Sequence, residues 1–235
     1  LFLAAGVVYG SIGNPVFASA EGYRLASKVL LTTVAVGMVT IWPVLRLAQA
    51  APLAGGVSAT ARDLAIVLIP MQALIWPQSL ITGWTIEAVA ALAVLFAGWT
   101  LIVGAVIALA TGSPRSHPKS LAALSASPHP IAPGARAAAM AAIGVLALAA
   151  PVVLIYLGPP SEADHTDAIN IPALCSPITA PWELFRDRSW TGRFAAALPE
   201  HWKPVLLTLL LGLASWAVLA ATRRSAGVEP GRTSA

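Results

Sequence analysis

The chain has 235 residues, of which 57% are hydrophobic and only 10% are charged, and its mean hydropathy is +0.78. Soluble proteins carry about 25% charged residues, so a water-soluble fold of this length lacks the charges to cover its surface. The formal net charge is +4, but the basic residues are scattered between apolar runs, which argues against a nucleic-acid-binding protein. The composition therefore excludes a soluble enzyme and a disordered chain, and it predicts an all-α, polytopic transmembrane helix bundle.

The first 20 residues carry no charge and are long enough to cross a bilayer. Two interpretations of this segment remain open. It is either a membrane-spanning helix that contains Gly13, Asn14 and Pro15, or the apolar part of a signal peptide, since residues 18–20 (Ala-Ser-Ala) have the form of a cleavage site. We favour the spanning helix because no basic region is present. The bundle accordingly has five or six spans.

Five further apolar runs are long enough, or nearly so, to cross the hydrocarbon core as helices. Lipid offers no hydrogen-bond partner to an open sheet edge, so unbroken runs of this length predict helices rather than strands. The second run contains Pro70 and Pro77, which predict breaks in the helix. The five runs are residues 29–45, 64–82, 86–110, 137–157 and 204–222.

The distribution of Lys and Arg predicts which helix ends face the cytoplasm, because cytoplasmic loops are enriched in these residues. One set of loops, together with the C-terminal tail, holds eight basic residues, and the other set holds six. The connections 46–62 and 115–136 are basic and nearly free of acid, so we place them and the C-terminus in the cytoplasm. Because the composition is rich in Ala, Gly and Arg, we expect a multi-pass protein of the bacterial cytoplasmic (inner) membrane.

This topology divides the chain into two membrane halves. The N-terminal half, residues 1–110, holds three or four spans. The C-terminal half, residues 137–222, holds two spans and an outer loop, residues 158–203. A Pro/Ser/Ala-rich cytoplasmic linker, residues 111–136, joins the halves, and a cytoplasmic tail, residues 223–235, follows the last span.

The outer loop is the one sizeable segment that we expect outside the bilayer. It combines acidic and basic residues with Trp182, Trp190 and Trp202, a mixture that suits the membrane–water interface. Residues 180–198 are predicted to form one or two short helices on the outer leaflet. We favour an interfacial anchor over a role in gating or partner contact.

The sequence predicts no catalytic, cofactor or metal site. Bis-histidine haem requires histidines on facing helices, but all four histidines lie in loops or at span ends. His165 with Asp164 and Asp167 is a weak metal signature. Cys175 is the only cysteine, which excludes an intramolecular disulfide and a Cys-based zinc site. We therefore expect that the protein is not an enzyme and that it binds neither a cofactor nor nucleic acid.

Polar residues within the predicted spans are the remaining candidates for function. Gln72 and Gln78 flank the proline-interrupted turn, where they either line a polar path or hold helices together. Glu87 lies at the outer rim of the longest span, either as a functional carboxylate or, more ordinarily, as an interface residue. Small residues at a spacing of four, such as Gly104 and Ala108, predict close helix packing.

Two parts of the chain resemble permeases of the ABC-2 type. Residues 176–180 (Ser-Pro-Ile-Thr-Ala), an interfacial region, residues 201–204 (His-Trp-Lys-Pro), a last span and residues 223–224 (Arg-Arg) resemble the C-terminal end of these permeases. Residues 13–16 (Gly-Asn-Pro-Val) resemble the Asn-Pro element near their start. Six spans, cytoplasmic termini and a long outer loop before the last helix are similar to the plan of that family.

The resemblance implies the membrane subunit of an ATP-driven exporter, which works as an oligomer with a separate ATPase. Such a subunit needs a cytoplasmic docking surface, which we expect at Arg46, Arg62, Asp63 and Arg115. The other interpretation that remains open is a non-catalytic scaffold or accessory subunit of a larger membrane complex. The lack of charged residues inside the predicted spans fits this second interpretation. In both cases membrane lipid surrounds the bundle.

Overall fold

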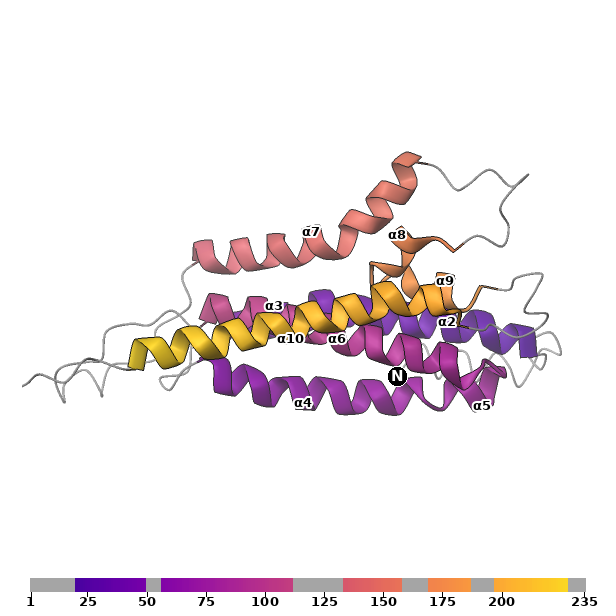
Figure 1. Cartoon of the computed structure of the whole chain (residues 1–235), viewed down its shortest axis with the longest axis horizontal. Helices are drawn as coiled ribbons and strands as arrows, with labels where there is room; N and C mark the ends of the chain where they lie inside the picture. The colour runs from indigo at the N-terminus through magenta and orange to yellow at the C-terminus, as the bar shows by residue number, and fades with distance from the viewer. Residues whose placement is uncertain (1–19, 50–55, 112–132, 158–168, 187–196, 228–235) are drawn as a thin grey trace, which may run out of the picture.

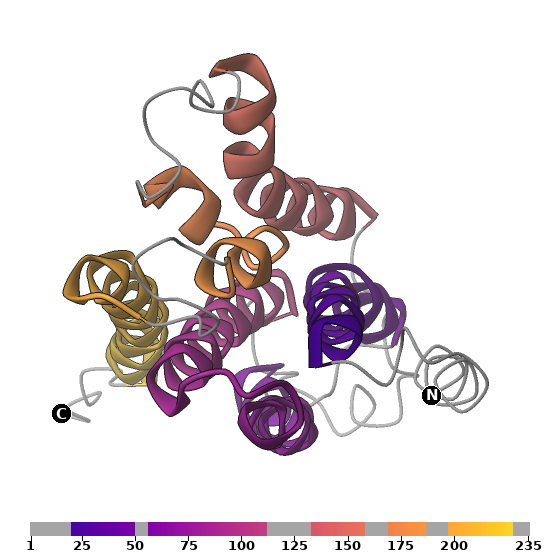
Figure 2. The same ribbon diagram turned by 90° about the vertical axis from the view of Figure 1, so that its right-hand side faces the viewer.

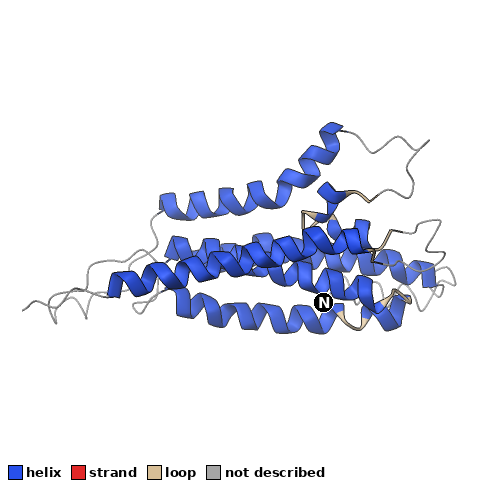
Figure 3. Ribbon diagram, in the orientation of Figure 1, coloured by secondary structure: helices blue, strands red, loops and turns tan. Residues whose placement is uncertain are grey.

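The computed structural model describes residues 20–49, 56–111, 133–157, 169–186 and 197–227 (Figure 1). All regular secondary structure within these ranges is helical (Figure 3), as the composition predicts. The long helices run side by side along the long axis of the molecule (Figure 1). The all-α prediction is therefore confirmed for the described part of the chain.

Four helical segments of the described chain are long and apolar enough to cross a membrane, so the chain is a candidate multi-span membrane protein. The predicted run 137–157 lies in α7 (Pro133–Leu157), whose apolar stretch, Pro133–Ala149, is shorter than these four. Residues 1–19 lie outside the described ranges. Both interpretations of this segment, a membrane span and a signal peptide, therefore stay predictions. The four segments match the other predicted runs with slightly wider bounds: Tyr23–Ala48, Ala59–Thr82, Ile86–Thr111 and Pro199–Thr222.

The first of these segments contains a local distortion. It consists of α2 (Ala20–Val36), the π-helical turn η1 (Gly37–Ile41) and α3 (Trp42–Ala48). Pro43 is the second residue after the distortion and has no N–H to donate to the carbonyl of the preceding turn. The wider π turn lets the helix continue past this missing hydrogen bond. It also contributes Met38 to the core, where only 3% of this residue is exposed.

The second segment is interrupted at one of its two prolines. It consists of α4 (Gly56–Ile75) and α5 (Gln78–Thr82), separated by a turn at Trp76 and Pro77. The predicted break at Pro77 is confirmed, whereas Pro70 lies inside the continuous α4, so the break predicted there is wrong. After α5, Gly83 adopts φ = 70°, a left-handed conformation that glycine reaches without a steric penalty.

The centre of the bundle is α6 (Ile86–Thr111), which is apolar on all sides. Such a helix is stable only when neighbours cover most of its surface, and much more of α6 is buried than of the other three candidate spans. Its most extensive contacts are with α10 (Pro199–Gly227) and α4. Figure 2, viewed along the bundle, shows α10, α4 and α2 arranged around it.

The contact between α6 and α10 depends on two glycines. A Cβ atom added to Gly98 would lie 2.8 Å from the backbone nitrogen of Leu209, and one added to Gly212 would lie 2.8 Å from the carbonyl oxygen of Gly98. Both obstacles are backbone atoms, so they cannot move unless a whole helix moves. Gly104 makes a similar approach to Leu64, with 2.9 Å between an added Cβ and Cδ2, which agrees with the predicted small-residue packing.

α7 lies at the edge of the bundle and bends along its length (Figure 1). Pro151 lies inside the helix and removes the N–H that would bond to the carbonyl of Ala147, which accounts for the bend. The helix buries one narrow stripe, formed by Ala139, Ile143 and Ala147 at a spacing of four residues. α7 is therefore attached to the bundle along a single line.

Two short helices follow α7, namely α8 (Ile171–Leu174) and α9 (Ala180–Leu184). α8 contacts α7 and α10, and α9 contacts α6 and α2. We call residues 170–186 the outer cap; α8 and α9 lie between α7 and α10, toward the end of the bundle at which α10 begins (Figure 1, Figure 2). The short-helix prediction for residues 180–198 is confirmed for α9, while residues 187–196 lie outside the described ranges.

Candidate functional site

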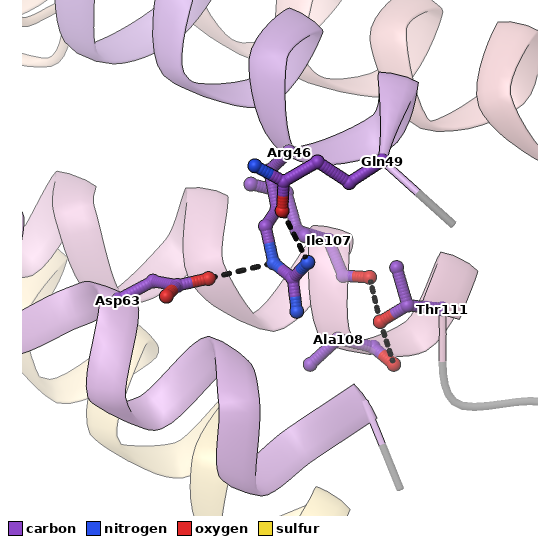
Figure 4. Close-up of polar contacts among 6 residues, drawn as sticks. All are labelled: Arg46, Gln49, Asp63, Ile107, Ala108 and Thr111. Carbon is purple, nitrogen blue, oxygen red and sulfur yellow. Dashed lines mark hydrogen bonds and ion pairs between the residues drawn. The ribbon is translucent and has the colours of Figure 1, made fainter. Parts of the chain in front are cut away.

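Arg46 and Asp63 meet at the end of the bundle where α3 ends and α4 begins (Figure 4). Arg46 Nε lies 2.6 Å from Asp63 Oδ2, and Arg46 Nη1 donates a hydrogen bond to Gln49 Oε1 at 2.9 Å. The Arg46 side chain is 9% exposed and that of Asp63 is 23% exposed, so water screens this ion pair less than a pair on the surface. The pair therefore ties α3 to α4.

The last turn of α6 lies beside this ion pair. Thr111 Oγ1 donates to the carbonyl oxygen of Ile107 at 2.9 Å, and Figure 4 shows the Arg46 guanidinium next to this turn. The carbonyl groups at a helix C-terminus carry partial negative charge, which favours a nearby cation. Arg46 is thus stabilised by Asp63 and by the end of α6.

The predicted ATPase-docking residues differ in how exposed their side chains are. Arg46 and Asp63 are held against each other, and Arg46 is buried. Arg62 is exposed on α4, next to the pair in sequence. Arg115 lies outside the described ranges. Docking of a partner at these residues stays a prediction, and among the three described members of the set Arg62 is the one with an exposed side chain.

The two glutamines hold parts of the bundle together. Gln72 Nε2 donates to the carbonyl oxygen of Ala93 on α6 at 3.1 Å, and its Oε1 accepts from Trp76 Nε1 at 3.0 Å. Gln78 is buried, and its Nε2 donates to the carbonyl oxygen of Leu74 at 3.0 Å, across the break between α4 and α5. The two amides therefore bind different partners and act as helix contacts, whereas a polar path through them stays a prediction.

Glu87 is exposed in the first turn of α6. A carboxylate at this position interacts favourably with the positive end of the helix dipole. Both interpretations of Glu87, a functional carboxylate and a residue at the membrane–water interface, stay predictions.

Ser176 in the outer cap supplies a hydrogen bond that α7 lacks. Its hydroxyl is buried and donates to the carbonyl oxygen of Ala147 at 2.7 Å. This carbonyl has no helical donor because the residue four positions later is Pro151. The backbone N–H of Ile178 in turn donates to Ser176 Oγ at 3.2 Å. The cap is thereby fixed to α7 at its bend.

Aromatic residues fasten the cap to two further helices. Trp182 Nε1 donates to Thr32 Oγ1 on α2 at 3.0 Å, and the Nζ of Lys28 lies 5.9 Å from the centre of the Trp182 ring system. Phe185 stacks on Trp84, just before α6, with ring centroids 3.7 Å apart. These contacts combine burial with cation–π and aromatic attraction. The cap is therefore anchored to α2, α6 and α7.

Glu183 joins the two halves of the cap. Its Oε1 accepts the backbone N–H of Asn170 at 3.0 Å, and its Oε2 lies 3.8 Å from Nη1 of Arg186. The side chain of Asn170 accepts the N–H of Ala173 at 3.1 Å and so caps α8. Glu183 is buried although it lies outside the candidate spans. The sequence alone does not single it out, because Asn170 is 13 residues away in the chain.

His201 is fully buried in the first turn of α10. Its Nδ1 accepts the backbone N–H of Leu198 at 2.8 Å. With Pro199 as the first helical residue, His201 occupies the third position, where a Glu or Gln side chain makes the same bond in a capping box. This histidine therefore helps to start α10. Among the described residues, no group of three or more His, Cys, Asp or Glu residues is arranged to hold a metal ion, and His165 lies outside them.

Replacing Ser176 by alanine is expected to destabilise the protein by about 1 kcal/mol, because it leaves the buried carbonyl of Ala147 without a donor. The change Pro151→Ala provides the matched background, since alanine restores the backbone N–H that bonds to this carbonyl. In that background Ser176→Ala should cost clearly less. The free energy of unfolding in detergent measures both effects. An equal cost in the two backgrounds would contradict the assigned hydrogen bond.

The described chain is thus a candidate multi-span membrane protein with polar contacts that tie its helices together at both ends. No protein-family model, no curated protein and no solved structure matches this chain.

Proposed function

We propose that the chain is a permease-like membrane subunit of an ATP-driven export system of the ABC-2 type. In this proposal it has no catalytic site of its own and works in an oligomer with a separate ATPase. The observation that supports it is the outer cap, a pair of short helices that fold onto the bundle directly before α10, the last candidate span. An interfacial region before the last span is what the resemblance to these permeases implies.

The opposite end of the bundle supplies a surface that suits an ATPase. The ion pair between Arg46 and Asp63 fixes the beginning of α4 relative to α3. Arg62 is exposed beside this fixed corner, so a partner that binds it contacts a rigid part of the membrane subunit. Movement of a bound ATPase would then be transmitted directly to α3 and α4.

The experiment that tests this proposal is purification of the full chain, tagged at its C-terminus, in a mild detergent. A stoichiometric ATPase should copurify, and its turnover should depend on the chain. Arg62→Glu should weaken this association, whereas Lys203→Glu, at the opposite end of the bundle, should not. Copurification of other membrane subunits without an ATPase would reject the exporter.

One observation favours the alternative of a non-catalytic scaffold. The described candidate spans carry ionisable residues only near their ends, and Gln72 is bonded to the backbone of α6. A path for a polar substrate through the bundle would need polar groups along its interior. In the exporter such a path must lie between subunits, whereas a scaffold needs no path at all.

The proposed orientation places the outer cap outside the cell. Labelling of Cys175, which lies in the cap, tests this orientation. This cysteine is exposed within the cap, so a membrane-impermeant maleimide should label it in intact cells. Partial burial raises the pKa of its thiol, because desolvation disfavours the thiolate. The labelling rate should therefore be low at neutral pH and increase as the pH rises toward this raised pKa.

The matched control for this labelling is Cys175→Ser, which removes the only thiol of the chain. Labelling that occurs only after the membrane is permeabilised would reverse the proposed orientation. It would also remove the layout on which the resemblance depends.

A further inference from the structure

The two ends of the bundle differ in charge. α3, α6 and α10 end, and α4 and α7 begin, at the same end, which we call the basic end (Figure 1). The described chain carries five arginines and one acidic residue there. On α2, α6, α10 and the outer cap, the opposite end carries four basic and four acidic residues. The residues of the basic end are Arg46, Arg62, Asp63, Arg136, Arg223 and Arg224.

Asp63, the one acid among the described residues of the basic end, is already paired with an arginine. Asp63 lies 2.6 Å from Arg46, which is itself buried. Within the described residues this leaves no carboxylate at the basic end for the other arginines. At the opposite end, by contrast, the acidic and basic residues are equal in number, and Glu183 lies 3.8 Å from Arg186.

Two of the remaining arginines have described side chains. Arg62 is exposed on α4. Arg136 is half-buried in the first turn of α7, and its Nε atom is buried without a hydrogen-bond partner among the described residues. A guanidinium group normally binds anionic oxygen atoms, and the buried Nε of Arg136 has none among the described residues.

We propose that the basic end binds the headgroups of anionic phospholipids, with Arg62 and Arg136 as the contacting residues. Both arginines lie close to the ends of apolar helices, at the depth where the headgroups of a surrounding bilayer meet the protein. The planar guanidinium matches the geometry of phosphate oxygens and can bind two of them at once. Asp63 does not oppose this binding, because Arg46 neutralises it.

The test uses the purified full chain in neutral detergent, without any ATPase, so its outcome is independent of the proposed transport function. The chain is titrated with short-chain phosphatidylglycerol and, separately, with short-chain phosphatidylcholine. We expect the anionic lipid to bind about tenfold more tightly. The double variant R62Q/R136Q should lose most of this preference. The control K28Q/K203Q, which removes two charges from the opposite end, should retain it.

Three results from the titrations of the unaltered chain and the control variant would overturn the proposal. The first is equal affinity of the unaltered chain for the two lipids, and the second is an equal loss of preference in the control variant. The third is competition by free glycerol 3-phosphate at millimolar concentration, which would indicate a site for a soluble phosphate. If the double variant R62Q/R136Q unfolds, the single variant Arg62→Gln tests the proposal instead. Arg62 is exposed, so this change leaves the fold intact. The single variant should lose a measurable part of the preference, and an unchanged preference would also overturn the proposal.

Discussion

Replacing Gly98 by alanine is expected to destabilise the protein by about 2–3 kcal/mol, because the added methyl group overpacks the contact between α6 and α10. The added Cβ would lie 2.8 Å from the backbone nitrogen of Leu209 and 2.9 Å from the Cα of that residue. Neither atom can move without shifting α10 away from α6. Such a shift would loosen the most extensive helix contact in the bundle. Thermal unfolding in detergent, followed by near-ultraviolet circular dichroism, measures the change.

Gly144 on α7 provides the matched control for this substitution. A Cβ added there meets nothing within 4 Å, so Gly144→Ala should be neutral or stabilising by up to about 1 kcal/mol, as alanine favours helix more than glycine does. The two alanine variants should therefore shift stability in opposite directions. Gly212→Ala should resemble Gly98→Ala, since its Cβ would lie 2.8 Å from the Gly98 carbonyl oxygen. The double variant should cost less than the sum of the two, because either change alone already separates the helices. Equal effects at Gly98 and Gly144 would contradict the close approach.

Replacing Asp63 by asparagine is expected to destabilise the protein by about 2 kcal/mol, because it leaves the Arg46 guanidinium buried without a counter-charge. The cost stays below that of a fully buried pair, since 23% of the Asp63 side chain reaches solvent. Unfolding in detergent at low and high salt measures the effect. Only a small dependence on salt is expected, because screening acts weakly on buried charges.

The neighbouring residue provides the control for Asp63. Arg62→Gln removes a charge from an exposed side chain one position away and should change stability by less than about 0.5 kcal/mol. The double variant Arg46→Met with Asp63→Asn should cost less than the two single changes together, because no charge is left unpaired. If Asp63→Asn and Arg62→Gln had the same small effect, Arg46 and Asp63 would not form the ion pair in solution.

The extent of the candidate membrane-spanning helices could be predicted from the sequence because it depends on local composition. The run 86–110 has no polar interruption, and the helix found there, Ile86–Thr111, differs by one residue. The two prolines of the next candidate span look alike in the sequence, yet only Pro77 interrupts the helix. Pro70 is accommodated inside α4, where contacts with α6 hold the helix on both sides of it: Leu64 lies against Gly104, and Gln72 is bonded to Ala93.

The contacts that fix the arrangement of the helices could not be predicted, because each joins residues that are far apart in the chain. Gly98 has no small residue four positions away, and Gly212 has only Thr208, so the significance of the two glycines appears only when α6 and α10 are placed together. Ser176 lies in an ordinary polar turn, and its partner is a carbonyl 29 residues away. Among the candidate docking residues, Arg46 and Asp63 could be placed at one end of the bundle, but not in contact.

The long-range contacts of the outer cap have a consequence for the order of assembly. The hydrogen bond between Trp182 and Thr32 joins residues 150 positions apart, and the stacking of Phe185 on Trp84 also joins residues that are far apart in the chain. Neither contact can form until the chain has been synthesised as far as the outer cap and α2 and α6 have taken their places in the bundle. Closure of the cap is thus a late event in biogenesis. Until then Trp84 and the hydroxyl of Thr32 lack these partners, and an unfinished chain presents that surface to quality-control proteases and chaperones.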